Sequence, residues 1–483
     1  MNRVVIFVFD GLQAELVTLE LMPRLSGFAD AGVRLARHQP VFPTVTRVNA
    51  SSIVAGCFPG THGLSGNRSV IPEFSPTESM NAMRPEFLEL QERGGTVLLV
   101  PTLAELLAEH GLEYIATGIG STGQSFVHHP NGEHAALGAT IHPEYALPLG
   151  LSEELFARFG AWPGRSLPNT ARIERMVDIV TDYVLEERDP AVALLWCSEP
   201  DGSQHGSPLN SPTVHDAARA ADAGFGRLLD YIEASDRADE TNVIVTCDHG
   251  HSTVEALVPL EALLLDAGFA APGEPGGVVV ADNGGAALLY VPDQDAGVVD
   301  RLASYLMQEH WAGPILVADR FGAIEGTHLT SLVGLDGPRG PDIAVSFSWD
   351  ARENEHGQPG YAYAASGRPG QGQHGSMSPW ELRTFTVAGG PAFRRATTVE
   401  GVTGHPDLAP TVLRVLGIDA PAHMDGRVIG EALAYGQPDE RPDPVRHEAS
   451  RSLDDGEYRQ SLSVAAGSRG GYLVSASSEY LDA

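Results

Sequence analysis

Six residues of the kinds that bind metal ions lie in four short motifs spread over most of the chain. They are Asp10 in Val-Phe-Asp-Gly, Asp201 and His205 in Glu-Pro-Asp-Gly-Ser-Gln-His-Gly, Asp248 and His249 in Cys-Asp-His-Gly, and His374 in Gly-Gln-His-Gly-Ser. Carboxylates mixed with imidazoles suit zinc or manganese, whereas an all-oxygen set would suit magnesium. Each motif alone is weak, because an Asp after a strand is usually a turn or helix-capping residue. The metal hypothesis therefore depends on the whole set.

Apolar runs of strand length adjoin all four motifs. The runs are 4–9 before Asp10, 191–197 before Asp201, 243–247 before Asp248, and 384–388 after His374. Amphipathic stretches at 102–109, 171–187 and 214–234 predict helices between them. Strands that alternate with helices predict an α/β fold, with a doubly wound, largely parallel sheet flanked by helices. Ligands of such sheets gather beyond the carboxyl ends of the strands, where the three Asp residues fall.

The segment between the last two motifs is predicted to be a smaller inserted α+β cap subdomain, residues 252–371. It has helix-like stretches at 257–267 and 298–310 and strand-like runs at 278–281 and 287–291, and its Gly-rich tail at 357–372 is expected to be loop. The catalytic core is then 1–251 plus 372–435. Residues 436–483 form a C-terminal extension that turns strand-like at 471–476.

The composition limits the partners. The 483 residues include 63 acidic and 31 basic residues, all of the latter Arg, for a net charge of −32. A polyanionic nucleic acid is therefore disfavoured as a partner. The start of the chain lacks a signal-peptide pattern and no apolar run approaches the roughly 18 residues that span a bilayer. We expect a cytoplasmic protein without a membrane partner, and the sequence leaves a homo-oligomer open.

A further segment completes a longer pattern. Residues 43–49, Pro-Thr-Val-Thr-Arg-Val-Asn, are followed by Ser-Ile-Val-Ala-Gly and by Thr-His-Gly-Leu-Ser-Gly-Asn at 61–67. An N-terminal Asp, a Thr, an Asp-x-x-x-His pair, an Asp-His pair and a late His, in this order, resemble the alkaline phosphatase superfamily, in particular its nucleotide pyrophosphatase/phosphodiesterase branch. The likeness extends over about residues 3–68, 191–251 and 372–432, and implies an alkaline phosphatase-like core.

The resemblance implies a role for each motif residue. Asp201, His205 and His374 would hold one metal ion. Asp10, Thr46, Asp248 and His249 would hold the other, with Thr46 as the nucleophile. Asn67 would contact a phosphate oxygen. By the same resemblance the two divalent ions would be zinc, with manganese as the alternative. His251, two residues after His249, could support the ligands, but a loop side chain is the simpler interpretation.

The implied chemistry agrees with the residue types. A Thr hydroxyl is almost never ionised at pH 7, and coordination to a divalent cation corrects that weakness. Two metal ions about 4 Å apart can stabilise the entering oxygen, the leaving oxygen and the phosphoryl charge. Two divalent ions would also give this acidic chain the local cationic centre that a phosphate substrate needs. A phosphothreonine would remain after the first displacement, and water would hydrolyse it.

The pattern departs from the family at Arg47, where nucleotide-cleaving members carry an aromatic residue that helps to hold the base. Arg47 could bind a second anionic group, such as a free phosphate oxygen or a carboxylate, or it could face solvent or pair with an acid. The same two interpretations apply to Arg68. Phosphonoacetate hydrolases share the metal order but bind their carboxylate with lysines, which this chain lacks.

We therefore expect a metal-dependent hydrolase of small phosphate esters, of the phosphodiesterase or nucleotide pyrophosphatase type. A phosphomonoesterase with Arg47 as a clamp for the dianion, and a phosphonate hydrolase in which Arg or His replaces the lysines, are the alternatives. A phosphotransfer mutase of the same superfamily is a weaker candidate, because its nucleophile lies in different local sequence. A binding protein without catalysis is disfavoured by the complete ligand set.

Overall fold

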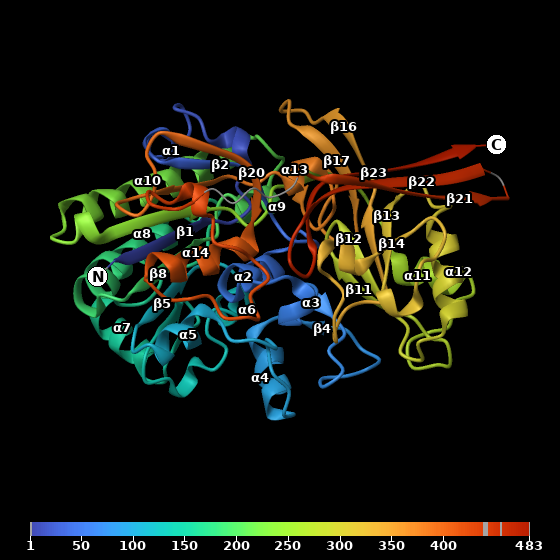
Figure 1. Cartoon of the computed structure of the whole chain (residues 1–483), viewed down its shortest axis with the longest axis horizontal. Helices are drawn as coiled ribbons and strands as arrows, with labels where there is room; N and C mark the ends of the chain where they lie inside the picture. Colours follow the sequence, from blue (N-terminus) through green and yellow to red (C-terminus); the bar gives the residue numbers. More distant parts are fainter. Residues whose placement is uncertain (1, 438–442, 455, 483) are drawn as a thin grey trace.

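The computed structural model describes residues 2–437, 443–454 and 456–482. A nine-stranded sheet, built from the N-terminal half of the chain and from two later strands, lies on the left of Figure 1, and a second β-rich region lies on the right. The order of the strands in the large sheet is β20 (Thr397–Gly404), β2 (Val33–Gln39), β19 (Thr386–Gly389), β9 (Thr241–Thr246), β1 (Arg3–Phe9), β8 (Val192–Cys197), β5 (Tyr114–Gly118), β6 (Ala139–His142) and β7 (Tyr145–Leu147).

The large sheet is mostly parallel. Strand β1 runs parallel to both of its neighbours, with Phe9 opposite Cys197 of β8 and Val8 opposite Thr246 of β9. The pairs β8/β5, β5/β6 and β2/β20 are also parallel, whereas β19 is antiparallel to β9 and β2, and β7 is antiparallel to β6. The predicted α/β fold with a largely parallel sheet is confirmed.

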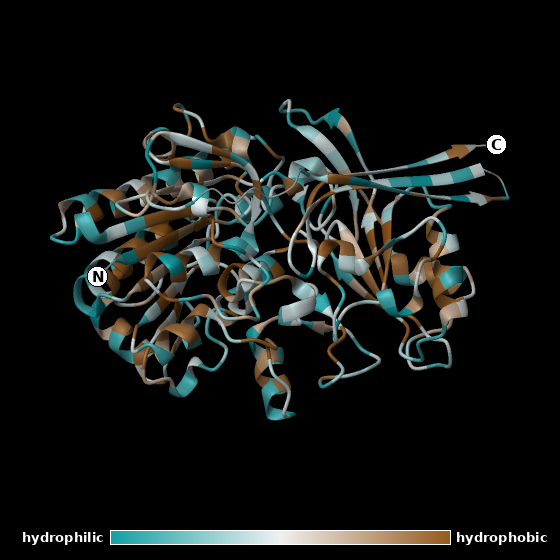
Figure 2. Ribbon diagram, viewed as in Figure 1, coloured by the Kyte–Doolittle hydropathy of each residue, from teal (hydrophilic) through white to brown (hydrophobic). Residues whose placement is uncertain are grey.

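Strand β1 is apolar throughout because both faces of the sheet are covered. Val4, Ile6 and Val8 pack into one core cluster, and Phe7 and Phe9 pack into the other. This double burial explains a continuous apolar run in place of an alternating one. Figure 2 shows hydrophobic residues along the central strands and hydrophilic ones on the outer faces of the helices. Helices α2 (Thr46–Ala55), α5 (Leu103–Glu109) and α14 (Leu408–Val415) cover the first face, and α1 (Pro23–Ala31), α8 (Thr170–Ile179) and α10 (Pro212–Ala234) cover the second.

The inserted segment contains its own five-stranded sheet. Its order is β11 (Val279–Asn283), β12 (Ala286–Tyr290), β15 (Ile343–Phe347), β13 (Ala312–Val317) and β14 (His328–Leu329), with helices α11 (Leu260–Asp266) and α12 (Ala296–Leu306) packed into its core cluster. A four-stranded sheet adjoins it, in the order β16 (Trp349–Glu353), β17 (Pro359–Ala364), β10 (Ser252–Leu257) and β18 (Gly372–Gln373).

One element of the insert was predicted wrongly. The Gly-rich tail at 357–372 was expected to be loop, but it contains β17, which pairs with β10 and β16. The side chains of β17 alternate between half-buried and buried, the pattern of a strand with one face against a core. Gly360 allows the close approach of Trp380, because a Cβ there would lie 2.6 Å from the indole ring.

The C-terminal segment forms an antiparallel sheet of β21 (Val445–Leu453), β22 (Gly456–Ala466) and β23 (Gly471–Asp482). The predicted strand at 471–476 is confirmed within β23. Tyr458 belongs to the core of the insert, and Gln460 accepts a hydrogen bond from Ile315 N at 2.8 Å. The division into core, insert and extension stays a prediction, and residues 438–442, 455 and 483 of the extension lie outside the described residues. None of the described helices combines the length and the hydropathy needed to cross a bilayer.

Candidate active site

Three aspartates meet beyond the carboxyl ends of β1, β8 and β9. Asp10 directly follows β1, and its backbone N–H donates to Cys197 at the end of β8. The backbone N–H of Asp201, the first residue of α9 (Asp201–Gly206), donates to the carbonyl of Asp10 at 3.0 Å. Asp248 follows β9 and accepts hydrogen bonds from the backbone of Gly11 and His249. The parallel register of the three strands therefore brings together aspartates that are 238 positions apart.

One oxygen of each aspartate lacks a hydrogen-bond donor. Trp196 donates to Asp10 Oδ2 at 2.8 Å, but Asp10 Oδ1, Asp201 Oδ1 and Asp248 Oδ2 have no hydrogen-bond partner among the described residues. All three atoms are buried. An unpaired buried carboxylate oxygen is costly unless a cation compensates it. The three atoms are thus well suited to bind metal ions.

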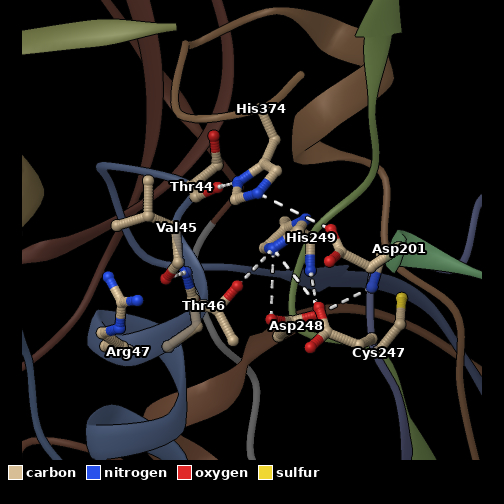
Figure 3. A network of polar contacts seen from close by, with 12 residues as sticks. Thr44, Val45, Thr46, Arg47, Asp201, Cys247, Asp248, His249 and His374 are labelled. Carbon is tan, nitrogen blue, oxygen red and sulfur yellow. Dashed lines mark hydrogen bonds and ion pairs between the residues drawn. The ribbon is translucent and has the colours of Figure 1, made fainter. Parts of the chain in front are cut away.

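Three histidines face Asp201. The Nε2 atoms of His205 and His251 lie 3.2 Å from Asp201 Oδ1. The Nε2 of His374 lies 3.7 Å from the same oxygen, and Figure 3 shows His374 facing Asp201. The Nδ1 of His374 donates to the carbonyl of Thr44 at 2.7 Å, and that of His205 contacts the carbonyl of Gly372. These two carbonyls keep the proton on Nδ1, so each Nε2 presents a lone pair.

A second group of ligand atoms lies around His249 Nε2. This atom is 3.1 Å from Thr46 Oγ1, 3.2 Å from Asp248 Oδ2 and 3.8 Å from Asp10 Oδ1. The carbonyl of Gly250 accepts from His249 Nδ1 at 3.1 Å. Figure 3 shows Thr46, on α2, pointing toward His249 and Asp248. Asp10, His249 and Asp201 also form a group of mutually close ligand atoms, so Asp201 lies between the two clusters.

Electrostatics favour cations at this site. Burial, together with the neighbouring Asp248 and Asp201, holds the pKa of Asp10 well above its usual range. Burial also raises the pKa of Asp201, but His205 and His251 outweigh that effect and lower it. Three carboxylates so close together repel one another unless positive charge is shared among them.

The predicted substrate residues lie at the mouth of the site. The side-chain oxygen of Asn67 accepts the backbone N–H of Arg47 at 3.1 Å, which leaves its NH2 group without a hydrogen-bond partner among the described residues. Asn67, Arg47 and Arg68 line a cavity of about 250 Å³ that also reaches His205 and His374. The insert completes this cavity through Asn283, whose amide donates to Arg68 O and accepts from Arg68 N. Arg68 itself is exposed and donates to Ser79.

Two residues near the ligands were not predicted. His251 is fully buried and close to Asp201, although a loop side chain was the simpler expectation. Glu381, in α13 (Pro379–Leu382), is also fully buried and accepts from Ser376 N, Ser376 Oγ and Thr44 Oγ1 at 2.6, 2.6 and 3.1 Å. Neither lies in a pattern that sequence alone distinguishes. The only available signal was the His-Gly-His run at 249–251, which places a second histidine two residues after His249.

Comparison with known proteins identifies the family. The model of the type I phosphodiesterase/nucleotide pyrophosphatase family matches residues 4–376. The chain belongs to this family. By class it is a hydrolase of phosphoric esters, and the resemblance to the nucleotide pyrophosphatase/phosphodiesterase branch of the alkaline phosphatase superfamily is confirmed. The ligand residues of the motifs lie within the matched range.

The relatives are distant. The bis(5'-adenosyl)-triphosphatase enpp4 of Xenopus laevis is 22% identical over 431 residues, which is 86% of this chain and 78% of that protein. Ectonucleotide pyrophosphatase/phosphodiesterase family member 1 of Mus musculus is 22% identical over 51% of this chain and only 23% of its own length. Among solved structures, an inactive variant of murine ectonucleotide pyrophosphatase/phosphodiesterase 5 in complex with AMP covers 90% of this chain with a TM-score of 0.61 at 18% identity. The human protein of the same name superposes with a TM-score of 0.60. These structural matches support the fold.

Proposed function

We propose that the protein hydrolyses small phosphate esters, in the manner of a phosphodiesterase or nucleotide pyrophosphatase, through a phosphothreonine at Thr46. The observation that carries this proposal is the position of Thr46 Oγ1, 3.1 Å from His249 Nε2. The same nitrogen lies 3.2 Å from Asp248 Oδ2 and 3.8 Å from Asp10 Oδ1, two oxygens without a hydrogen-bond partner among the described residues. A hydroxyl among metal-ligand atoms is the arrangement that activates an otherwise weak nucleophile.

The residues divide into two ligand sets under this proposal. Asp201, His205 and His374 would hold one divalent cation, and Asp10, Thr46, Asp248 and His249 would hold the other. Two such cations, which we propose to be zinc with manganese as the alternative, would make the Thr46 hydroxyl nucleophilic and offset the charge on the phosphoryl group. The mixture of histidines and carboxylates supports these metals over magnesium.

The chain's own residues then have defined tasks. Thr46 Oγ would form a bond to phosphorus while the bond from phosphorus to the leaving oxygen breaks, and that oxygen takes up a proton. The free NH2 group of Asn67 would donate to a phosphoryl oxygen, since its Oδ1 is already used by Arg47 N. Water would then cleave the phosphothreonine, releasing the phosphoryl product and restoring the Thr46 hydroxyl.

Substitution of the nucleophile tests the proposal. With bis-p-nitrophenyl phosphate and zinc-loaded protein, Thr46→Ala should lose about 10³-fold or more in turnover, as expected when a covalent nucleophile is removed. Acid quenching of the wild type followed by mass spectrometry should find a p-nitrophenyl phosphoryl group on Thr46, because one of the two p-nitrophenyl groups leaves in the first displacement, and a chelator should abolish turnover. Thr398→Ala, at an exposed position of β20, is the matched control. Full turnover by Thr46→Ala, or by the chelated wild type, would contradict the mechanism.

A further inference from the structure

Arg47 differs from the buried arginines Arg3 and Arg339 in what surrounds its charge. Arg3 is paired with Asp189 at 3.1 Å, and Arg339 is paired with Glu73 at 2.8 Å. Arg47 is half-buried at the mouth of the site, and no carboxylate of the described residues is within ion-pair distance of its guanidinium. Removing a cation from water without a counter-ion is costly. An anion bound beside the guanidinium of Arg47 would therefore be stabilising.

The contacts that Arg47 does make are weak. Its Nε lies 3.4 Å from Ser121 Oγ, and its Nη2 contacts the thioether of Met83 at 2.9 Å. Neither partner carries a charge, and a thioether is a poor acceptor. The guanidinium has five N–H donors in a planar fork, so most of its capacity to bind an oxyanion is unused.

The position of Arg47 would allow the unused N–H donors of its guanidinium to reach a substrate. Arg47 directly follows Thr46 in the first turn of α2, and its guanidinium lies on the opposite side of Thr46 from Asp248 in Figure 3. It lines the cavity that also reaches His205 and His374. A phosphoryl group in contact with Thr46 would therefore have carboxylates and metal ligands on one side and Arg47 on the other.

The rest of the cavity is lined mostly by polar side chains, and no described Phe, Tyr or Trp contributes to it. Arg68 and the amides of Asn67, Asn81, Asn283 and Gln373 can donate to an anion, and the carboxylate of Asp282 also belongs to the lining. Aromatic side chains are the usual means of stacking a nucleobase. A volume of about 250 Å³ with polar walls is instead suited to a compact, charged group.

We propose that Arg47 binds a second anionic oxygen group of the substrate, next to the phosphorus that Thr46 attacks. This inference rests on the proposed function and names its substrate class. The group is either the additional unesterified oxygen that gives a phosphomonoester its second negative charge, or a phosphate or carboxylate bonded beside the attacked phosphorus. A bidentate contact from the guanidinium to such an oxyanion would satisfy the unpaired charge.

Three substrates of graded charge provide the test. Bis-p-nitrophenyl phosphate offers one negative charge, p-nitrophenyl phosphate offers two on the attacked phosphorus, and ADP offers a neighbouring phosphate. In Arg47→Met, which keeps the length without the charge, kcat/KM for at least one of the two latter substrates should fall about 100-fold, as expected for loss of a charge-assisted contact. For bis-p-nitrophenyl phosphate the fall should be at least about tenfold smaller, because this substrate carries no second anionic group. The substrate that suffers most identifies the position of the second charge, and Arg47→Lys should restore only part of the loss.

Binding of inorganic phosphate separates this inference from the proposed function. Calorimetry on zinc-loaded protein should show phosphate binding weakened at least about tenfold in Arg47→Met. It should remain at the wild-type level in Arg395→Met, which alters an exposed arginine before β20. If the wild type turns over none of the substrates, the proposed function fails, whereas phosphate affinity still decides the role of Arg47. Equal losses on all three substrates, or unchanged phosphate affinity, would overturn the inference. Equal zinc content and Tm would show that the variants are folded.

Discussion

At the scale of single residues, the carboxylate of Asp201 is the group around which the histidines gather. The ring of His251 lies between two glycines where it approaches the Asp201 carboxylate. A Cβ at Gly11 would lie 2.6 Å from His251 Cε1, and one at Gly372 would lie 3.0 Å from His251 Cδ2. Both glycines are therefore needed for the ring to fit. Because burial lowers the pKa of His251 to about 4, the ring is neutral and can offer a lone pair or an N–H to its surroundings.

We predict that His251→Met weakens metal binding at the Asp201 cluster. The ring either supplies a ligand or orients the Asp201 carboxylate, and loss of such supporting groups typically costs about 10- to 100-fold in metal affinity. Competition between the protein and a chromogenic chelator measures the affinity, and elemental analysis gives the number of bound ions. His110→Met, which changes an exposed histidine, should leave both values as in the wild type. An unchanged affinity in His251→Met would show that the ring only fills space.

Residue types and order selected residues that the fold brings together, although their roles as metal ligands stay a prediction, and they selected the surroundings less well. Asp10, Asp201 and Asp248 could be selected because each follows a predicted strand, and parallel strands place such residues at one edge. His251 could not be selected, because the direction of a ring two residues after a ligand depends on the backbone at Gly11 and Gly372. The sequence also could not show that Arg47 lacks a carboxylate partner, because ion pairing depends on residues that are distant in sequence.

At the scale of elements, the segment from β18 to α13 fixes the late histidine. Glu381 is its central residue: it accepts from the backbone and hydroxyl of Ser376 and from the hydroxyl of Thr44. Thr44 in turn accepts from His374 through its carbonyl and from Gly375 through its hydroxyl. Glu381 is thus linked to a metal-ligand candidate through two short contacts, although it does not reach the ligand cluster itself.

Glu381→Gln should loosen this segment without removing a ligand. A glutamine amide presents one acceptor oxygen and one NH2 group, so one of the donors from Ser376 or Thr44 would face another donor. We expect a loss of about 1–3 kcal/mol in the free energy of unfolding, the usual cost of an unsatisfied buried donor. Denaturant titration of the metal-free protein measures it. Glu400→Gln, at an exposed position of β20, should change stability by less than about 0.5 kcal/mol. Wild-type stability in Glu381→Gln would remove Glu381 from the support of His374.

The elements themselves were predictable where their pattern was regular. Strands β1, β8 and β9 are buried on both faces, so their apolar runs were visible. Strand β17 was missed, because Gly, Tyr and Ala at 359–364 carry little of the β-branched signal. The antiparallel direction of β19 also could not be foreseen. It depends on how the chain returns from the insert.

At the scale of the whole molecule, a protein with a net charge of −32 gathers three aspartates at the centre of its large sheet. The insert and the C-terminal sheet pack against each other and lie on the right of Figure 1, with the large sheet on the left. Composition alone suggested that such a chain needs a cationic centre for an anionic substrate. The folded chain meets this need in two ways, with ligand sets suited to divalent cations and with an unpaired Arg47. The cytoplasmic location stays a prediction.

The aspartate cluster should make stability depend on metal to different extents in the wild type and in Asp10→Asn. In the wild type, zinc at 100 to 1,000 times its Kd should stabilise the fold by about 3–4 kcal/mol, and a chelator should remove that gain. In Asp10→Asn the amide can still accept from Trp196, but one of three repelling buried charges is gone. The metal-free variant should therefore be more stable than the metal-free wild type, whereas its gain from zinc should be much smaller. Thermal unfolding of both proteins with zinc and with chelator gives the four values. If Asp10→Asn were less stable than the wild type in chelator, repulsion among the three aspartates would not be what the cations relieve.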